Sequence, residues 1–326
     1  MGESARRVAV DVAATAKKIL ANVERVILGK RQQIVFSLVA WLSEGHILME
    51  DVPGVAKTML ARALAKSVGC KLKRIQCTPD LLPSDVTGTS IFNQKMAEFE
   101  FRPGPVFTNI LLADEINRTT PRTQAALLEA MAESRVTIDG TTYDLDPPFL
   151  VIATQNPIDH EGTFPLPEAQ LDRFLMKFSL GYPGVEDELK MLTASRKRHP
   201  LETIEAVVSQ EELRACQQAT RSVKIHENIQ RYIVGLVHAT RNHDQLMLGA
   251  SPRASLALYR TSQSLAALLG RNYVLPDDVK RVLGPVLGHR LILRPESRLR
   301  KMTSQDVLDD VLQEVPVPML DAETAV

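Results

Sequence analysis

The sequence is poor in aromatic residues and cysteine, carries no net charge and has no long apolar run. Only 5% of its 326 residues are Phe, Trp or Tyr, and 39 basic residues balance 39 acidic ones. Few aromatic rings leave little surface for base stacking, and a neutral chain has no overall field that attracts a polyanion, so binding of nucleic acid is not expected. Three cysteines without a metal-binding spacing argue against a disulfide framework and fit a reducing compartment. No run approaches the roughly 18 apolar residues of a membrane span, so we expect a cytoplasmic protein.

We expect no targeting signal in the first residues of the sequence. Residues 1–20 lack the continuous apolar core of a signal peptide and are typical of an amphipathic helix. Gly2 begins a stretch like a myristoylation signal, but Arg6 stands where that signal needs Ser or Thr. From residue 301 onward there is one Lys against six acids, which predicts an acidic last helical turn or a frayed acidic tail.

The first part of the chain alternates short apolar runs with helical patterns. Buried strands are predicted at 46–50, 73–77, 109–114 and 148–155, and the clearest helices at 57–69 and 120–133. Such alternation predicts an α/β fold, with a parallel sheet covered by helices on both faces. An Asp-Gly pair within residues 135–145 predicts a tight β-hairpin in addition.

The second part of the chain reads as all-helical after a Gly- and Pro-containing joint at 180–188. Helices are predicted at 209–223, 228–243, 254–270 and 276–291. Turn and cap residues mark their ends: Ser209 with Glu212 as a capping box, Gly270 as a stop and Pro276 as a first-turn residue; Gly69 likewise ends the helix at 57–69. We therefore predict two domains, an α/β core over 1–182 with an N-terminal helix and a smaller helical domain over 183–326.

The stretch EDVPGVAKTML at 50–60 almost matches a phosphate-binding loop. The pattern G-x-x-x-x-G-K-[ST] requires glycine where Asp51 and Ala56 stand, and only Lys57 and Thr58 fit. The stretch nevertheless follows a predicted strand and opens a helix, where backbone N–H groups of residues 54–58 can hold phosphates. Lys57 would then neutralise the terminal phosphate and Thr58 would bind Mg²⁺. A strand, a turn and an unrelated helix remain the alternative for this stretch alone.

A second motif lies 57 residues downstream, where the apolar strand NILLADE ends in Asp114 and Glu115. Two adjacent carboxylates at the end of a buried strand are costly unless a cation lies beside them. Asp114 would hold Mg²⁺ and Glu115 would polarise an attacking water. Solvated acids at a strand end are the alternative, which the Lys-Thr loop after the preceding strand makes less attractive.

Three further polar residues are candidates on weaker grounds. Asn156 ends the strand VIATQN, where an amide can orient water, although Asn before Pro also opens turns. Arg173 and Arg253 lie in short polar segments between helical stretches. Either arginine read alone is most simply a solvated surface residue.

Taken together, these elements resemble an AAA+ ATPase. Four segments are similar in sequence to the motifs of the MoxR group: EDVPGVAKT, FEFRPGPVFTNILLADEINRTTPRTQAALLEAMAE, VIATQNPIDHEGTFPLPEAQLDRF and SPRA. The resemblance covers roughly residues 20–300. The ATPase subunit of magnesium chelatase is a near relative that shares many of these motifs.

The resemblance implies a role for each matching position. It places Lys57 and Thr58 in Walker A, Asp114 and Glu115 in Walker B and Asn156 at sensor 1. Arg173 matches the arginine finger that reaches a neighbouring subunit, and Arg253 matches sensor 2. Ile27, Leu28 and Gly29 match the segment that lines the adenine, while Lys30 departs from the Gln of many relatives. The nucleotide-binding segment as a whole comprises Pro53, Gly54, Val55, Ala56, Lys57, Thr58 and Met59. EFEFRPGPVF lies where this group carries an insertion that faces the ring pore.

The resemblance also implies what the protein does. It predicts ATP hydrolysis with Mg²⁺ at the interfaces of a homo-oligomeric ring, a hexamer, that remodels or matures a client protein. Members often work with proteins that bear von Willebrand factor A domains, and metal or cofactor insertion recurs. An ATP-binding scaffold with little turnover and a nucleic-acid-stimulated motor are the alternatives. Ala56 is the sharpest departure, and we expect it at negative φ with its methyl group turned away from the phosphates.

Overall fold

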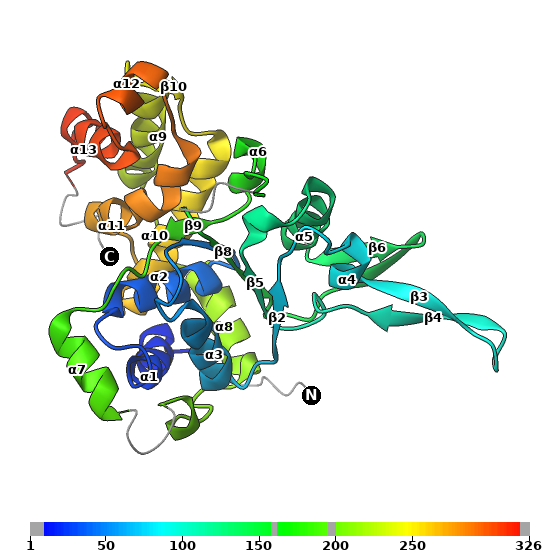
Figure 1. The fold of residues 1–326 in the computed structure, drawn as a ribbon. Coiled ribbons are helices and arrows are strands. Elements are labelled where there is room, and N and C mark those ends of the chain that lie inside the picture. The colour runs from blue at the N-terminus through cyan, green and yellow to red at the C-terminus, as the bar shows by residue number, and fades with distance from the viewer. Residues whose placement is uncertain (1–9, 158–161, 195–199, 320–326) are drawn as a thin grey trace, which may run out of the picture.

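The computed structural model describes residues 10–157, 162–194 and 200–319, and it is built around a five-stranded parallel sheet (Figure 1). The strand order is β2-β5-β8-β1-β9. The strands are β1 (Ile47–Glu50), β2 (Leu72–Gln76), β5 (Ile110–Asp114), β8 (Leu150–Gln155) and β9 (Met176–Phe178). The first four lie within two residues of the predicted strands, and the α/β class is confirmed. The short edge strand β9 was not predicted.

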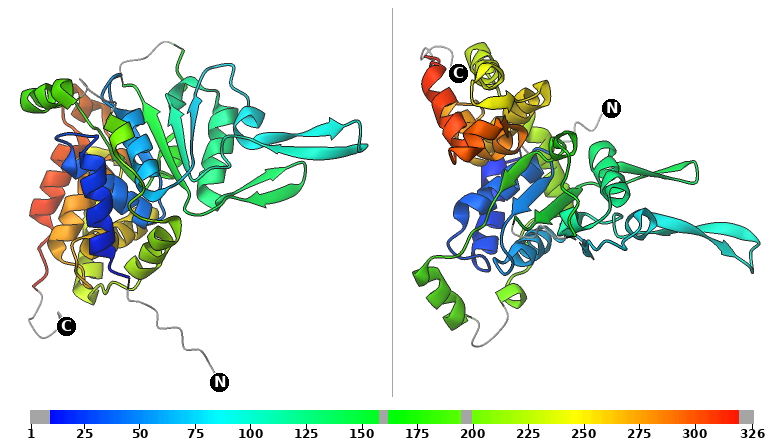
Figure 2. Two further views of the ribbon diagram at one scale, coloured as in Figure 1. Left: turned by 90° about the horizontal axis from the view of Figure 1, so that it is seen from below. Right: turned by 45° about the horizontal axis from the view of Figure 1, so that its top comes forward.

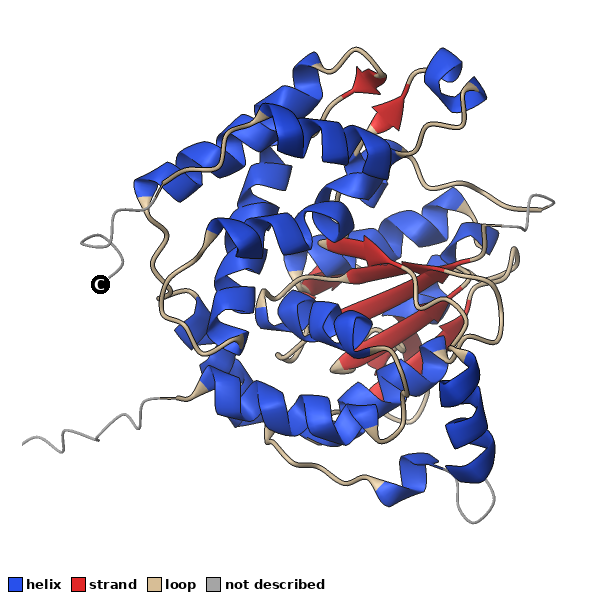
Figure 3. Cartoon of the chain, turned by 90° about the vertical axis from the view of Figure 1, so that its left-hand side faces the viewer, coloured by secondary structure: helices blue, strands red, loops and turns tan. Residues whose placement is uncertain are grey.

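Helices flank the sheet on both faces (Figure 3). The helices of the first part are α1 (Val12–Glu24), α2 (Arg31–Leu42), α3 (Lys57–Val68), α4 (Pro83–Thr87), η1 (Ile116–Arg118), α5 (Pro121–Glu133) and α6 (Glu168–Leu171). α3 ends at Gly69, whose positive φ of 65° forms the predicted C-cap. Residues 1–9 of the segment 1–20 predicted as an N-terminal helix lie outside the described residues.

Alternate side chains of each central strand enter two different apolar cores, because successive strand residues point to opposite faces. Ile47 and Met49 of β1, for example, pack on the face covered by α1, α2 and α3. Leu48 packs on the other face, together with Leu127 and Leu128 of α5. Burial on both faces explains why these strands are continuous apolar runs in the sequence.

Two β-hairpins project from one side of the sheet domain (Figure 2). β6 (Arg135–Ile138) and β7 (Thr141–Asp144) form the predicted hairpin, and Asp139 and Gly140 at its turn both have positive φ. β3 (Gly88–Asn93) and β4 (Glu98–Pro103) form a second hairpin. Its second strand lies within the segment EFEFRPGPVF, whose role as a pore-facing insertion stays a prediction. The ring of Phe101 in the second hairpin stacks on Tyr143 in the first, with ring centroids 4.2 Å apart.

The second part of the chain is mostly helical. It contains α7 (Val185–Ala194), η2 (Pro200–Thr203), α8 (Gln210–Thr220), α9 (Glu227–Asn242), α10 (Pro252–Leu268), α11 (Pro276–Leu287), η3 (Gly288–Arg290), α12 (Pro295–Leu299) and α13 (Ser304–Glu314). The Ser209–Glu212 capping box and the first-turn Pro276 are present as predicted. The prediction that this part of the chain contains only helices was wrong in one detail, because two short strands, β10 (Leu246–Leu248) and β11 (Ile292–Leu293), pair with each other.

The helices after residue 183 do not all gather in one place. α9 to α13 pack on one another at one end of the molecule, and α7 lies apart from them (Figure 1). α8 packs against α1 and α2, with Gln217 donating a hydrogen bond to the Trp41 carbonyl. The boundary between 182 and 183 therefore stays a prediction. Within the described ranges, no helix is long and apolar enough to cross a membrane.

Candidate nucleotide site

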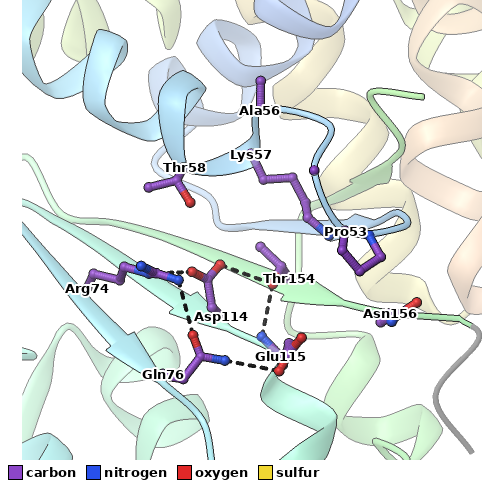
Figure 4. Close-up of a pocket in the computed structure, with 11 residues that line it drawn as sticks. Pro53, Ala56, Lys57, Thr58, Arg74, Gln76, Asp114, Glu115, Thr154 and Asn156 are labelled. Carbon is purple, nitrogen blue, oxygen red and sulfur yellow. Dashed lines mark hydrogen bonds and ion pairs between the residues drawn. The ribbon is translucent and has the colours of Figure 1, made fainter. Parts of the chain in front are cut away.

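A cavity of about 340 Å³ lies at the carboxyl ends of the central strands (Figure 4). Its walls come from the loop before α3, from β2, β5 and β8, and from the residues that follow these strands. The lining residues are Pro53, Gly54, Ala56, Lys57, Thr58, Arg74, Gln76, Asp114, Glu115, Thr154 and Asn156. The structure thus brings together residues that the sequence places up to 103 positions apart.

Parallel pairing explains this convergence. β5 pairs with β2 and β8, and β8 pairs with β1, so the carboxyl ends of all four strands lie at one edge. The edge of a parallel sheet is where ligands bind in folds of this class. Asp114 ends β5, Asn156 follows β8, and Lys57 begins the helix that follows β1.

Lys57 points from the first turn of α3 back across the loop. Its Nζ donates a hydrogen bond of 2.9 Å to the Asp51 carbonyl. Burial lowers the pKa of the Lys57 ammonium, while the charges of Asp51, Asp114 and Glu115 act in the opposite direction. Three carboxylates therefore favour the charged form that a phosphate would need.

The two acids at the end of β5 are held by a polar network. Arg74 Nε donates to Asp114 Oδ2 at 2.6 Å, and Gln76 Nε2 donates to Glu115 Oε2 at 3.0 Å. Thr154 Oγ1 donates to Asp114 Oδ1 at 3.2 Å and accepts from the Glu115 backbone N–H at 2.9 Å (Figure 4). Every acid side chain of the pair has a partner, so its orientation is set by neighbouring strands.

Asp51, which replaces the first glycine of the loop pattern, does not line the cavity. Its side chain is buried, and it accepts hydrogen bonds from the backbone N–H groups of Leu180 at 2.6 Å and Gly181 at 2.9 Å. These two residues begin the joint that leads to the helical part. The acid therefore ties the loop between β1 and α3 to that joint, which a glycine could not do.

Ala56 adopts a left-handed conformation with φ of 65°, so the expectation of a negative φ was wrong. The loop keeps the backbone shape for which glycine is usually chosen, and the alanine bears the steric cost of its Cβ. Gly54 has a φ of 88° with no atom within 4 Å of a built Cβ, so its glycine is needed for conformation and not for space. Glu115 is left-handed as well, at φ 58°. Such outliers at one cavity suggest that its shape is over-determined by the fold.

Replacing Ala56 with glycine is expected to stabilise the protein by about 1 kcal/mol, because the left-handed backbone then costs nothing. The free energy of unfolding in urea measures this. Ala125→Gly is the matched control: it lies exposed inside α5 and is expected to lose about 0.5–1 kcal/mol. A destabilised Ala56→Gly variant would contradict the reading of this loop.

The other residues predicted to bind nucleotide lie outside this cavity. Val55 and Met59 turn into the apolar core beneath the loop. Ile27 is buried in the same core, and Leu28 is half-buried. Gly29 has a φ of 70°, and a Cβ built there would lie 1.9 Å from Asp187 Oδ2 of α7. A role of residues 27–29 at an adenine ring stays a prediction.

Arg173 and Arg253 are brought together in a second cavity of about 400 Å³, which shares no residue with the first. Both are exposed, and Arg173 Nη1 donates to the Leu128 carbonyl at 2.8 Å. Arg253 Nη1 lies 3.8 Å from Asp172 Oδ2. Neither arginine faces the cavity that contains Lys57 of the same chain.

Sequence reasoning missed three polar residues of the first cavity: Arg74, Gln76 and Thr154. Arg74 and Gln76 alternate along β2, so they share one face next to β5. Thr154 precedes Asn156 by two residues along β8 and its end, a spacing that places both on one side of an extended chain. Polar residues spaced by two at the carboxyl ends of predicted strands were the signal that could have identified them.

Comparisons with known proteins agree with this fold and cavity. A model of the ATPase family associated with various cellular activities (AAA) matches residues 46–176, and a model of the AAA lid domain matches residues 238–311. A crystal structure of a putative ATPase from Cytophaga hutchinsonii superimposes with a TM-score of 0.90 at 40% identity, covering 97% of this chain and 98% of that one. The fold and cavity thus define an AAA+ ATPase.

Full-length relatives narrow the family further. The chain is 51% identical to the uncharacterized protein YeaC of Bacillus subtilis, over 93% of this chain and 94% of that protein. It is 43% identical to chaperone MoxR1 of Mycobacterium tuberculosis, over 94% and 84%, and 32% identical to protein MoxR of Paracoccus denitrificans, over 91% and 95%. The chain belongs to the MoxR group of AAA+ ATPases.

Proposed function

We propose that this protein binds ATP with Mg²⁺ in the cavity around Lys57 and hydrolyses it at the subunit interfaces of a ring. The observation that carries the proposal is the convergence of Lys57, Asp114 and Glu115 on one cavity. Phosphoryl transfer depends on positioning and on neutralising charge, and these side chains supply both. Glu115 would polarise the attacking water and Asn156 would orient it.

The oxygen donors at the cavity suit Mg²⁺, which prefers hard oxygen ligands such as carboxylates. Thr58 at the start of α3 and Asp114 at the end of β5 would hold the ion. When bound, it would neutralise charge on the phosphate oxygens. Lys57, which lines the same cavity, would bind the same phosphates.

The positions of two arginines support the proposed ring. Arg173 and Arg253 line a cavity of their own, so they would act on nucleotide held by a neighbouring subunit. A hexamer is our proposal for its size. The name of the chaperone relative supports remodelling or maturation of client proteins as the output. We further propose a cytoplasmic location, and a protein with a von Willebrand factor A domain as partner, with metal or cofactor insertion as one setting.

Isothermal calorimetry with MgATP tests the site directly. Lys57→Ala is expected to weaken MgATP binding by about 10–100-fold, because a charge-assisted hydrogen bond to phosphate is lost. Lys18→Ala, at an exposed position of α1, is the control that removes a lysine without touching the cavity. Unchanged affinity in Lys57→Ala, or no heat with the unaltered protein, would refute the assignment of the loop.

A further inference from the structure

A buried arginine in the helical part of the chain binds the segment that carries Arg173. Arg290, at the end of η3, has a side chain that is only 4% exposed. Its Nε donates to Asp172 Oδ1 at 2.7 Å, and its Nη2 donates to the carbonyls of Phe174 at 2.8 Å and Asp172 at 3.2 Å. Nη1 reaches the Leu175 carbonyl at 3.3 Å and also bonds the Val286 carbonyl. The guanidinium thus engages the residues on both sides of Arg173.

Burying the Arg290 guanidinium costs free energy, and its contacts require the geometry of a guanidinium. Burial lowers the pKa of Arg290, and Asp172 offsets part of that effect through a hydrogen bond and its charge. A buried cation is tolerated only with such partners, and breaking one side leaves the other uncompensated. The flat fork of five N–H donors is what allows one side chain to reach a carboxylate and several carbonyls, and lysine cannot reproduce it.

The neighbouring His289 strengthens the same attachment. Its ring is buried, and its Nε2 lies 3.0 Å from the Phe174 carbonyl. Burial, and then the charge of Arg290, keep the pKa of His289 well below its usual value. A neutral ring at this position holds the segment without adding a second buried cation.

Asp172 also connects to the start of α10. Ser251 Oγ lies 3.3 Å from Asp172 Oδ2, and Arg253 Nη1 lies 3.8 Å from the same oxygen. Arg290 meets the other carboxylate oxygen, across 118 positions of sequence. One carboxylate therefore joins η3, α10 and the segment that bears Arg173.

We propose that Arg290 is a positioning residue for trans catalysis: it joins the segment 172–175 to the helical domain, so that Arg173 and Arg253 are presented to the neighbouring subunit as one unit. The inference rests on the proposed trans action of Arg173. Movement of the helical domain would then move the arginine finger with it. The nucleotide state of one subunit would thereby affect the hydrolysis rate in the neighbouring subunit. Arg290 itself does not line the cavity around Lys57; it lines the second cavity, together with Arg173 and Arg253.

Mixed rings test this placement. A Glu115→Gln chain is inactive in its own site but still donates Arg173, and an Arg173→Ala chain has an intact site but no finger. An equimolar mixture is expected to recover ATPase activity. Adding Arg290→Lys to the Glu115→Gln chain is expected to lower the recovered kcat by about 10–100-fold with KM unchanged, because the finger is misplaced. Adding it to the Arg173→Ala chain is expected to cost about two-fold at most.

The controls separate the possible failures. Arg298→Lys, an exposed arginine of α12, should have no effect in either chain. Arg290→Gln serves as a second variant, and light scattering checks that each mixture forms rings of unchanged size. If the mixture without Arg290 substitutions fails to recover activity, trans action of Arg173 is wrong and the inference falls with it. If it recovers, but the loss is absent or equal in both placements, or the rings no longer form, only the positioning role is wrong.

Discussion

Replacing Arg173 with alanine is expected to lower the ATPase rate by about 10³–10⁵-fold, the usual effect of removing an arginine finger. The affinity for MgATP should stay within a few-fold of the unaltered protein, because Arg173 does not line the cavity around Lys57. A change in rate without a change in affinity is the signature of an interaction made only in the transition state. Phosphate release at saturating ATP and calorimetry with MgATP measure the two quantities.

Arg122→Ala is the control for this experiment, since it removes an exposed arginine from the first turn of α5. Its rate should match that of the unaltered protein. If Arg173→Ala retained near-normal turnover, the arginine would be an ordinary surface residue and the ring would need another source of positive charge. Among the described residues, its guanidinium donates one hydrogen bond, to the Leu128 carbonyl, so its loss should leave the fold intact.

The sheet and the main site helices could be predicted because they follow local rules. Strands buried on both faces appear as apolar runs. Asp114 and Asn156 stand at the ends of two such strands and Lys57 begins the helix after a third, on the side of the sheet where ligands bind. The Asp-Gly turn of the β6–β7 hairpin likewise depends only on its own residues. Each of these features is encoded within a few consecutive positions.

Features that depend on distant contacts could not be predicted. β9 has only three residues, and it is a strand because the fold places it beside β1, which is distant in the sequence. In the β3–β4 hairpin, the exposed side chains of Phe92 and Phe99 face each other with ring centroids 5.3 Å apart. The apolar and polar residues of these strands therefore do not alternate as in a half-buried strand. The bonds of Asp51 to Leu180 and Gly181 join segments 129 and 130 positions apart.

The left-handed Ala56 shows where a residue preference was outweighed. Taken alone, alanine avoids positive φ by about 1–2 kcal/mol. In the folded chain, β1 and the start of α3 impose the loop shape, and the apolar core beneath Val55 compensates the cost. The same balance applies to Glu115, whose left-handed backbone lets its N–H donate to Thr154.

Glu115→Gln is expected to lower the hydrolysis rate by about 10²–10⁴-fold while ATP binding is retained. The amide matches the shape of the carboxylate but cannot accept a proton from the attacking water. The side chain is held by Gln76 at 3.0 Å and by Arg118 at 3.2 Å, so the variant can keep one oxygen contact and its position at the cavity. Measured phosphate release should fall, and MgATP affinity should be equal or higher.

The consequence of that arrest is a persistent ATP-bound state, and it separates the ATPase from a mere ATP-binding scaffold. A scaffold would show the same slow phosphate release before and after the substitution. Glu129→Gln, at an exposed position of α5, supplies the matched change away from the cavity and should leave the rate unaltered. Because the network of Arg74, Gln76 and Thr154 orients both acids, a large effect of Glu115→Gln with a silent Glu129→Gln would place the chemistry at the end of β5.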